Sequence, residues 1–283
     1  MNQFSFDNLR DKVCIITGGG GVIGNAIAKC LSAVGVKIAV IDLIKEAADK
    51  TAKALYDSTG TQAIGVQASV LDKESLLIAK KEINDKLGKI DILINCAGGN
   101  SPLATTQYEF IDKENMNDLG KTFYGLDVEG FRKVFDLNFL GTLIPTMAFT
   151  TDMIEKGGGS VLNISSMNSF RPLTKIPAYS AAKSSINNFT EWLAVHLAKV
   201  NIRVNALAPG FFLTNQNRFL LIDEKTGKLT ARGEKILAAT PMGKFGDPED
   251  LQGAVLYLLS DLSKFVTGIV IPIDGGFNVY SGV

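Results

Sequence analysis

The 283-residue sequence has no excess of charge of either sign and no long apolar run. Lysine plus arginine total 29, as do aspartate plus glutamate, so the formal net charge is zero. Without a broad electrostatic field the protein has little to attract nucleic acid or anionic lipid, and any bound anion must be held by a local site. Apolar runs such as Ile38–Ile41 fall far short of the roughly 18 residues that span a bilayer. The N-terminal MNQFSFDNLRDK lacks an apolar signal core, so we expect a cytoplasmic protein that binds neither nucleic acid nor membrane.

Cysteine and histidine are scarce. The three cysteines, Cys14, Cys30 and Cys96, are odd in number and lack metal-ligand spacing, so we expect reduced structural thiols. The single histidine, His196, lies in an apolar helical stretch with no partner motif. Neither a metal site nor a histidine-based catalytic triad is therefore expected.

Short apolar runs alternate with longer segments of helical period. Seven runs have the continuous apolar character of strands buried on both faces, which is typical of a parallel sheet. They are Lys12–Thr17, Val36–Asp42, Gln62–Ala68, Lys89–Asn95, Ser160–Ser165, Ile202–Ala208 and Gly268–Ile273. The segments between them have helical spacing and charged outer faces. They are Val22–Val34, Ile44–Thr59, Lys73–Leu87, Val128–Lys156, Ala178–Val200 and Pro248–Asp261.

The repeated order of strand, helix and strand implies right-handed crossovers. We therefore predict an α/β fold with a doubly wound, seven-stranded parallel sheet, the Rossmann fold, in a single domain over residues 1–283. Two segments interrupt the alternation: the polar residues 98–126 and the partly helical residues 210–240. Because extended loops at the carboxyl ends of strands shape ligand pockets, we expect both insertions to border a substrate site.

A run of four glycines, in the sequence TGGGGVIG from Thr17 to Gly24, is either a loose linker or a phosphate-binding turn. It joins a predicted buried strand to an amphipathic helix, whose N-terminus would direct free N–H groups at a pyrophosphate. Asp42 ends the next strand, 18 positions after Gly24. A carboxylate there can accept both ribose hydroxyls of NAD and would repel the 2′-phosphate of NADP. We therefore predict a dinucleotide loop and a preference for NAD over NADP.

A tyrosine and a lysine stand four residues apart on a predicted helix, so Tyr179 and Lys183 share a face. A phenol has an ordinary pKa of about 10, and a neighbouring ammonium favours the phenolate, so we expect a lowered pKa for Tyr179. Ser166, at the end of a predicted strand, could hold a substrate oxygen by a hydrogen bond. The spacing alone occurs by chance on many helices, but together with the glycine loop it favours proton-transfer chemistry.

These motifs together resemble the short-chain dehydrogenase/reductase family in order and spacing over nearly the whole sequence. The motifs are TGGGGVIG, Asn95-Cys96-Ala97-Gly98, Asn138 in LNFLGT, Ser166, Tyr179-x-x-x-Lys183, Pro209-Gly210 and Asp274-Gly275-Gly276. The resemblance implies a hydride-transferring enzyme in which Tyr179 is the general acid or base and Ser166 orients the carbonyl or alcohol oxygen. It also implies that Lys183 lowers the pKa of Tyr179 and binds ribose, and that Asn138 supports a proton-relay water.

The resemblance also implies how the cofactor is bound. Asn95 would brace the central sheet, and Thr214 would reach the nicotinamide carboxamide. The sequence departs from the family at Val22, which fills a glycine position of the loop, and at Ser69, where an aspartate usually holds adenine; a hydroxyl without charge gives a weaker contact. The expected cofactor contacts are Gly18, Gly19, Gly20, Gly21, Val22, Ile23, Asp42, Ser69, Val70, Asn95, Ala97, Gly98, Tyr179, Lys183, Pro209, Gly210, Phe212 and Thr214. Which of the four consecutive glycines approaches the phosphates stays open.

Further stretches resemble a narrower group within the family, the D-mannonate oxidoreductases or fructuronate reductases, which interconvert D-fructuronate and D-mannonate. They are Cys96–Pro102, Ala104–Thr106, Ser166–Phe170, Pro172–Pro177 and Tyr280–Val283. A pocket for a sugar acid should offer a cation and several amide or hydroxyl groups. The candidates are Asn100, Ser101, Asn168, Arg171, Lys175 and Arg218, with Gln216 and Asn217 beside the last. For the carboxylate we favour Arg171 or Arg218 over Lys175, because arginine forms two parallel hydrogen bonds.

Two alternatives remain open. A reductase of the same class could act on another keto-sugar acid, a polyol or an acyl carbonyl, although the neutral sequence shows no sign of a basic surface for an acidic acyl carrier. A different class, a non-catalytic dinucleotide-sensing or scaffold protein, would have no use for Ser166, Tyr179 and Lys183 together. The helix Ala178–Val200 carries Trp192 and other apolar residues beyond one buried stripe. Because members of the family usually assemble as tetramers through such helices, we expect a homotetramer.

Overall fold

Seven parallel strands form one sheet at the centre of the molecule. The computed structural model describes residues 5–214 and 218–282. The strands are β1 (Val13–Thr17), β2 (Lys37–Asp42), β3 (Ala63–Gln67), β4 (Ile92–Asn95), β5 (Gly159–Ile164), β6 (Ile202–Pro209) and β7 (Val270–Ile273). Their order across the sheet is β3-β2-β1-β4-β5-β6-β7, so the predicted doubly wound sheet is confirmed.

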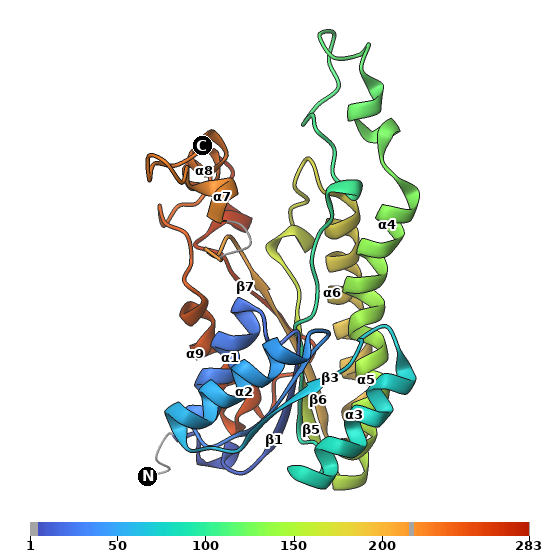
Figure 1. The fold of residues 1–283 in the computed structure, drawn as a ribbon, viewed down its shortest axis with the longest axis vertical. Helices are drawn as coiled ribbons and strands as arrows, with labels where there is room; N and C mark the ends of the chain where they lie inside the picture. Colours follow the sequence, from blue (N-terminus) through green and yellow to red (C-terminus); the bar gives the residue numbers. More distant parts are fainter. Residues whose placement is uncertain (1–4, 215–217, 283) are drawn as a thin grey trace.

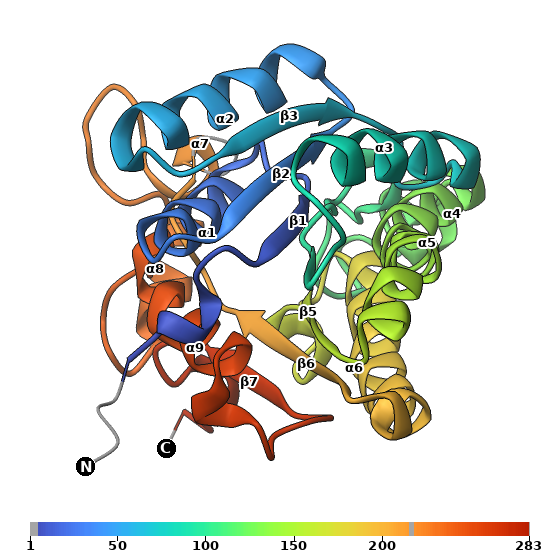
Figure 2. The same cartoon turned by 90° about the horizontal axis from the view of Figure 1, so that it is seen from below.

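Helices cover both faces of the sheet (Figures 1 and 2). On one face, α1 (Val22–Ala33), α2 (Lys45–Thr59) and α9 (Gln252–Leu259) enclose one apolar cluster with the strands. On the other face, α3 (Lys73–Lys86), α5 (Gly141–Lys156) and α6 (Pro177–Leu197) enclose a second. All five residues of β1 and all four of β4 are buried, which explains their continuous apolar sequences.

The order of the strands reverses between β1 and β4, and ligands of doubly wound folds bind at such a point. Thr17 at the end of β1 pairs in register with Asn95 at the end of β4. The glycine run and the loop after β4 therefore leave the sheet side by side, at its carboxyl edge.

The prediction of one continuous helix over residues 128–156 is wrong at residues 136–140. The segment consists of α4 (Val128–Phe135), a π-helical turn (Asp136–Leu140) and α5. Pro145 inside α5 has no N–H for the carbonyl of Gly141, and the wider turn lies directly before this gap. The side chain of Asn138, in the π-helical turn, donates to the carbonyl of Val134 at 2.7 Å. A single π-helical turn within a helix is frequent at functional sites.

The two insertions meet above the carboxyl edge. Residues 98–126 contain three short 3-10 turns and project beyond the sheet (Figure 1). Residues 210–240 contain α7 (Arg218–Leu221) and α8 (Ala231–Ala238), which confirms the partly helical prediction. An ion pair of 2.5 Å joins Lys235 of α8 to Glu109 of the first insertion.

Three further findings concern residues 5–214 and 218–282. No helix there is long and apolar enough to cross a membrane. No group of three or more histidine, cysteine or acidic side chains there could hold a metal ion. The three cysteines are unpaired, and burial raises the pKa of Cys30 to about 12 and that of Cys96 to about 11. These thiols stay protonated at neutral pH.

Candidate active site

The glycine loop lies too close to its neighbours to hold side chains. Gly18 has φ +62°, and a Cβ there would lie 2.9 Å from the Cα of Ala97. A Cβ on Gly24 would lie 2.6 Å from the carbonyl oxygen of Gly18. Because the contacting atoms belong to backbone, they cannot move aside easily. The requirement for glycine seen in the sequence therefore follows from packing of the glycine loop against the loop after β4 at Gly18 and against itself at Gly24.

The N-terminus of α1 fits a bound anion. Helix α1 begins at Val22 after Gly21, which has no side chain to cap it, and its first turn has no acidic residue. Free N–H groups at a helix N-terminus attract phosphate. Val22, which occupies a glycine position of the family's loop, and Ile23 are the first two residues of α1. The valine therefore leaves the N–H groups of the helix N-terminus in place. The loop thus has the shape and polarity that a dinucleotide pyrophosphate requires.

Asp42 lies beside this loop at the end of β2. Its Oδ2 accepts a hydrogen bond from the N–H of Gly20 at 3.2 Å, and its Oδ1 accepts one from the N–H of Ile44 at 3.1 Å. The half-buried carboxylate is therefore held in one orientation. Farther along the same edge, the hydroxyl of Ser69 accepts from the N–H of Leu71 at 3.3 Å, and Val70 packs against Gly141.

Two buried polar residues fix the loop after β4. The hydroxyl of Thr17 accepts from the N–H groups of Cys96 at 3.1 Å and Ala97 at 3.2 Å. This role was missed in the sequence, although Thr17 opens the glycine motif. Asn95 donates to Asn163 on β5 and to Thr146 on α5, both at 2.9 Å. Its amide therefore ties β4 to the next strand and to a helix on the second face.

Asn138 holds the start of the first insertion. It is fully buried, and its Nδ2 donates to the carbonyl of Gly99 at 2.7 Å while its Oδ1 accepts from the N–H of Gly99 at 3.3 Å. A Cβ on Gly98 would lie 2.6 Å from Asn138 Oδ1 and 3.3 Å from Lys183 Nζ. The backbone of Gly98 thus separates the buried amide from the buried amine, and only glycine leaves room for both.

Ser166, Tyr179 and Lys183 come together where β5 meets α6. Ser166 follows β5, and Tyr179 and Lys183 lie in the first two turns of α6. The side chain of Ser166 hydrogen-bonds to Tyr179. Lys183 is 4% exposed, lies 5.5 Å from the centroid of the Tyr179 ring and donates to the carbonyl of Ile164 at 2.8 Å. The sequence-predicted set therefore occupies one site.

The pKa values of this set differ from the expectation. Burial raises the pKa of Tyr179 above 10, and the hydrogen bond from Ser166 offsets this only in part. The expected lowering by Lys183 is wrong for this arrangement, because desolvation outweighs the favourable effects on the phenolate. Burial also lowers the pKa of Lys183 to about 8. At neutral pH Tyr179 is a phenol that can donate a proton, and Lys183 is an ammonium that can lose one slightly above neutrality.

A group of side chains that the sequence did not reveal holds the turn after Ser166. The hydroxyl of Ser169 donates to the carbonyl of Ser166 at 2.6 Å and accepts from Nδ2 of Asn187 at 2.8 Å. Ser184 donates to the carbonyl of Ser169 at 3.0 Å. Serine and asparagine on an amphipathic helix give no sequence signal for such a role, because any exposed helix face carries them.

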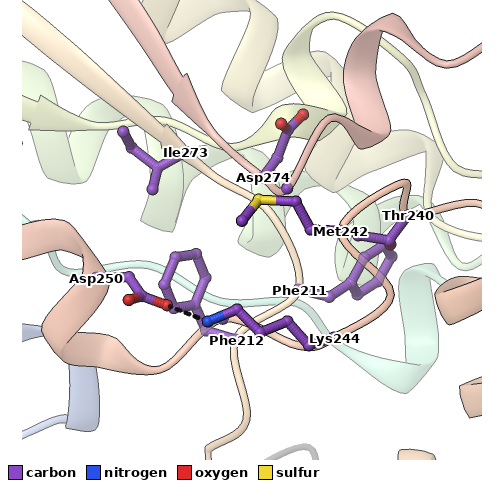
Figure 3. Close-up of a pocket in the computed structure, with 10 residues that line it drawn as sticks. Phe211, Phe212, Thr240, Met242, Lys244, Asp250, Ile273 and Asp274 are labelled. Atoms are coloured by element: carbon purple, nitrogen blue, oxygen red, sulfur yellow. Dashed lines mark ion pairs between the residues drawn. The ribbon is translucent and has the colours of Figure 1, made fainter.

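The segment after β6 lies at the carboxyl edge of the sheet and packs against the segment after β7. Pro209 ends β6, and a Cβ on the next residue, Gly210, would lie 2.7 Å from the Cα of Asp274. Phe212 is buried and lines a cavity of about 240 Å³, and an ion pair of 3.8 Å between Lys244 and Asp250 lies at its side (Figure 3). The cavity-lining segment 240–250 was not identified from the sequence. The carbonyl of Thr214 accepts a hydrogen bond from the N–H of Arg218 at 2.9 Å.

The predicted substrate residues are divided among three segments. In the first insertion, Nδ2 of Asn100 donates to Thr105 at 2.9 Å and Ser101 accepts from the N–H of Leu103, so both have local partners. Arg171 and Lys175 lie between Ser166 and Tyr179, where Arg171 is exposed. Arg218 is exposed at the start of α7. Gln216 and Asn217 lie outside the described residues. Asn168, in the turn after Ser166, is buried.

A doubly wound sheet, a glycine loop at α1 and a serine, tyrosine and lysine at β5 and α6 define a class of oxidoreductases that act on a CH–OH or C=O group. The protein belongs to the short-chain dehydrogenase/reductase family: a model of this family, described as enoyl-(acyl carrier protein) reductase, matches residues 20–278. The alternative of a non-catalytic protein on the same fold is thereby set aside.

Individual relatives and a solved structure are similar to this sequence over nearly its whole length. An uncharacterized oxidoreductase of Haemophilus influenzae is 51% identical over 284 residues, which cover 100% of this sequence and 99% of the relative. A crystal structure of a provisionally assigned D-mannonate oxidoreductase from Haemophilus influenza, with bound NAD, has a TM-score of 0.92 and 50% identity and covers 98% of this sequence and 99% of its own. A 2-dehydro-3-deoxy-D-gluconate 5-dehydrogenase of Formosa agariphila is 31% identical over 95% of this sequence and 93% of the relative.

Proposed function

We propose that this enzyme transfers a hydride between NAD(H) and a sugar acid and interconverts D-fructuronate and D-mannonate. The observation that carries the proposal is the convergence of Ser166, Tyr179 and Lys183 beside the uncapped N-terminus of α1. The sugar-acid substrate is supported by the similar Haemophilus structure assigned provisionally to D-mannonate and by the relative that acts on a dehydro-deoxy-gluconate. The NAD preference is supported by the oriented carboxylate of Asp42.

The cofactor would be held by the glycine loop, by Asp42 at the adenosine ribose and by Lys183 at the second ribose. When bound, it supplies or accepts the hydride. Ser166 donates its proton in a hydrogen bond to the substrate carbonyl oxygen, which orients the carbonyl. The raised pKa of Tyr179 keeps its phenol protonated at neutral pH, so Tyr179 gives its proton to the same oxygen as negative charge develops there. Lys183 then lies close enough to stabilise the phenolate.

The substrate carboxylate needs a cation on the side of the insertions. Arg171 and Arg218 are both exposed, and either could form two parallel hydrogen bonds with it. Arg171→Ala and Arg218→Ala distinguish the two. The variant that loses activity while it still binds NADH identifies the carboxylate ligand.

An NADH-oxidation assay over a panel of keto-hexonates tests the substrate. We expect the highest kcat/KM for D-fructuronate. Faster turnover of another keto-sugar acid, or of a polyol in the reverse direction, would replace the substrate but keep the class. No turnover of any carbonyl by a protein that binds NADH would contradict the proposed function as a whole.

We also propose a homotetramer in the cytoplasm. The assembly is supported by a row of stacked or edge-packed rings across the π-helical turn and α6, with Trp192 58% exposed and Val195 78% exposed. Apolar surface of this kind marks contact sites. Light scattering should give four subunits for the wild type and fewer for Trp192→Glu, and a monomeric wild type would contradict the proposal. The location is supported by the three unpaired thiols.

A further inference from the structure

Asn168 carries a buried amide without a hydrogen-bond partner. The residue is 5% exposed, and its Oδ1 is shielded from solvent yet accepts no hydrogen bond. Its Nδ2 donates to no other residue among those that the structure describes. By contrast, Asn95 and Asn163 each use Nδ2 in hydrogen bonds with other side chains, although Oδ1 of Asn95 is also unpaired. Because buried polar groups are nearly always paired in folded proteins, the unpaired Oδ1 of Asn168 requires an explanation.

The backbone of the same residue controls the serine of the site. The N–H of Asn168 donates to the hydroxyl oxygen of Ser166 at 3.2 Å. This bond occupies one acceptor position of the hydroxyl and leaves its proton for donation, to Tyr179 in this structure and to a substrate oxygen once a substrate is bound. Asn168 therefore belongs to the turn that sets the direction of the Ser166 hydroxyl.

The neighbours of Asn168 cannot easily become its partners. Ser169, Ser184 and Asn187 are bonded to one another and to the carbonyl of Ser166. Ser180 on α6 and Asn95 on β4 also have buried side-chain oxygens without a partner, and neither makes a bond with Asn168. The turn is thus held in place by its surroundings while the side-chain oxygen of Asn168 has no partner.

We propose that the Asn168 amide binds a hydroxyl group of the substrate, on the carbon next to the reacting carbonyl. The substrate class in this inference rests on the proposed function. Asn168 follows Ser166 by two residues, so a molecule whose carbonyl oxygen is held by Ser166 presents the adjacent carbon to this turn. Oδ1 can accept from that hydroxyl, and Nδ2 can donate to its oxygen. A site built to bond a hydroxyl rejects analogues that lack it, because its own buried groups then stay unpaired.

A pair of substrates measures this role directly. The pair is the preferred keto-hexonate and its analogue without the hydroxyl next to the ketone. We expect the wild type to favour the hydroxylated member about 100-fold or more in kcat/KM. In Asn168→Leu we expect this ratio to fall below about 10-fold, with turnover of the deoxy analogue within about 3-fold of the wild type. Equal losses on both substrates, with an unchanged ratio, would show a structural role only and overturn the inference.

The control variant is Asn84→Leu, because Asn84 on α3 also has a buried, unpaired Oδ1 but lies away from the site. It should leave the ratio unchanged. If the wild type reduces no keto-hexonate, the proposed function fails, and the same comparison is made with 1-hydroxy-2-butanone and 2-butanone. A wild-type preference for the hydroxyketone that Asn168→Leu abolishes still supports the inference, and an Asn168→Leu ratio equal to that of the wild type overturns it.

Thermal stability supplies a second readout that does not depend on turnover. Replacing an unpaired buried amide by an apolar side chain of similar size removes a desolvated polar group. The Tm of Asn168→Leu, measured without ligands, should therefore equal or exceed that of the wild type, and NADH binding should be unchanged. A clear fall in Tm, or failure to fold, would show that the amide has an internal partner such as a buried water and would overturn the inference.

Discussion

The two sides of the carboxyl edge are built in different ways. On the cofactor side, a Cβ on Gly18, Gly24 or Gly98 would lie within 3 Å of an atom of Ala97, Gly18 or Asn138, respectively. On the proposed substrate side, the turn after Ser166 carries a buried, unpaired amide oxygen at Asn168 and an exposed cation at Arg171. The cofactor side is thus specified by backbone geometry and the substrate side by side-chain chemistry.

This difference determines what each side tolerates. Glycines in contact with backbone cannot be replaced without moving a strand or a helix, so the cofactor side is sensitive to the smallest added group. Replacing a side chain that has no partner inside the folded protein should cost little stability, because no internal interaction is lost. Variants on the cofactor side should therefore lose stability and cofactor binding. Variants on the substrate side should lose turnover alone.

The largest effect is expected where the two sides meet. Tyr179→Phe removes only the hydroxyl that gives the proton in the proposed mechanism, so kcat should fall by about 10³-fold or more while NADH binding is unchanged. Steady-state kinetics and a fluorescence titration with NADH measure the two quantities. Tyr56→Phe, on the exposed face of α2, is the control and should behave as the wild type. An active Tyr179→Phe enzyme would disprove the mechanism.

A methyl group on the cofactor side tests the packing argument. In Gly24→Ala the new Cβ would lie 2.6 Å from the carbonyl oxygen of Gly18, so the loop or α1 must shift. We expect NADH affinity to fall by about 10-fold or more, with a lower Tm, since the helix N-terminus no longer meets the phosphates in the same place. Gly253→Ala in α9, where a Cβ has open space, should keep affinity and gain about 0.5–1 kcal/mol of stability. Equal behaviour of the two variants would remove the distinction.

A side chain on the cofactor side also has a specific role. Asp42→Ala should weaken NAD more than NADP and shift the ratio of their affinities by about 10-fold, because in the proposed binding mode the carboxylate accepts the ribose hydroxyls and repels a 2′-phosphate. Binding titrations with both cofactors measure the ratio. An unchanged ratio would show that Asp42 does not select the cofactor and serves only to hold the backbone through its hydrogen bonds to Gly20 and Ile44.

The smallest effect concerns the pH dependence of stability. The pKa of Lys183 is lowered to about 8 in the folded protein from 10.5, so between these pH values the unfolded protein binds more protons and stability rises with pH. Lys183→Met should remove this gain, which differential scanning calorimetry measures as a flatter plot of Tm against pH from 8 to 10. The raised pKa of Tyr179 has the opposite effect only above pH 10. The same slope in wild type and variant would contradict the burial of a lysine that titrates near 8.

How far the sequence predicted this molecule also follows from the difference between the two sides. Strand β1 and the glycine run could be identified because burial and close approach restrict residue type locally. The interruption at Asp136–Leu140 could not, since its sequence is helical and the contact of Asn138 with Gly99 that accompanies it forms only in the assembled fold. The raised pKa of Tyr179 depends on desolvation by the assembled fold, which spacing along a helix does not reveal.

The hold of Asn138 on Gly99 has a consequence for the evolution of the enzyme. Both the N–H and the carbonyl of Gly99 are bonded to this one amide, so the backbone leaves the sheet from a fixed point whatever residues follow. Natural selection can lengthen, shorten or replace the following loop without altering the position of β4 or the glycine run. Descendants of this fold can therefore acquire new substrates while they inherit the same hydride-transfer machinery.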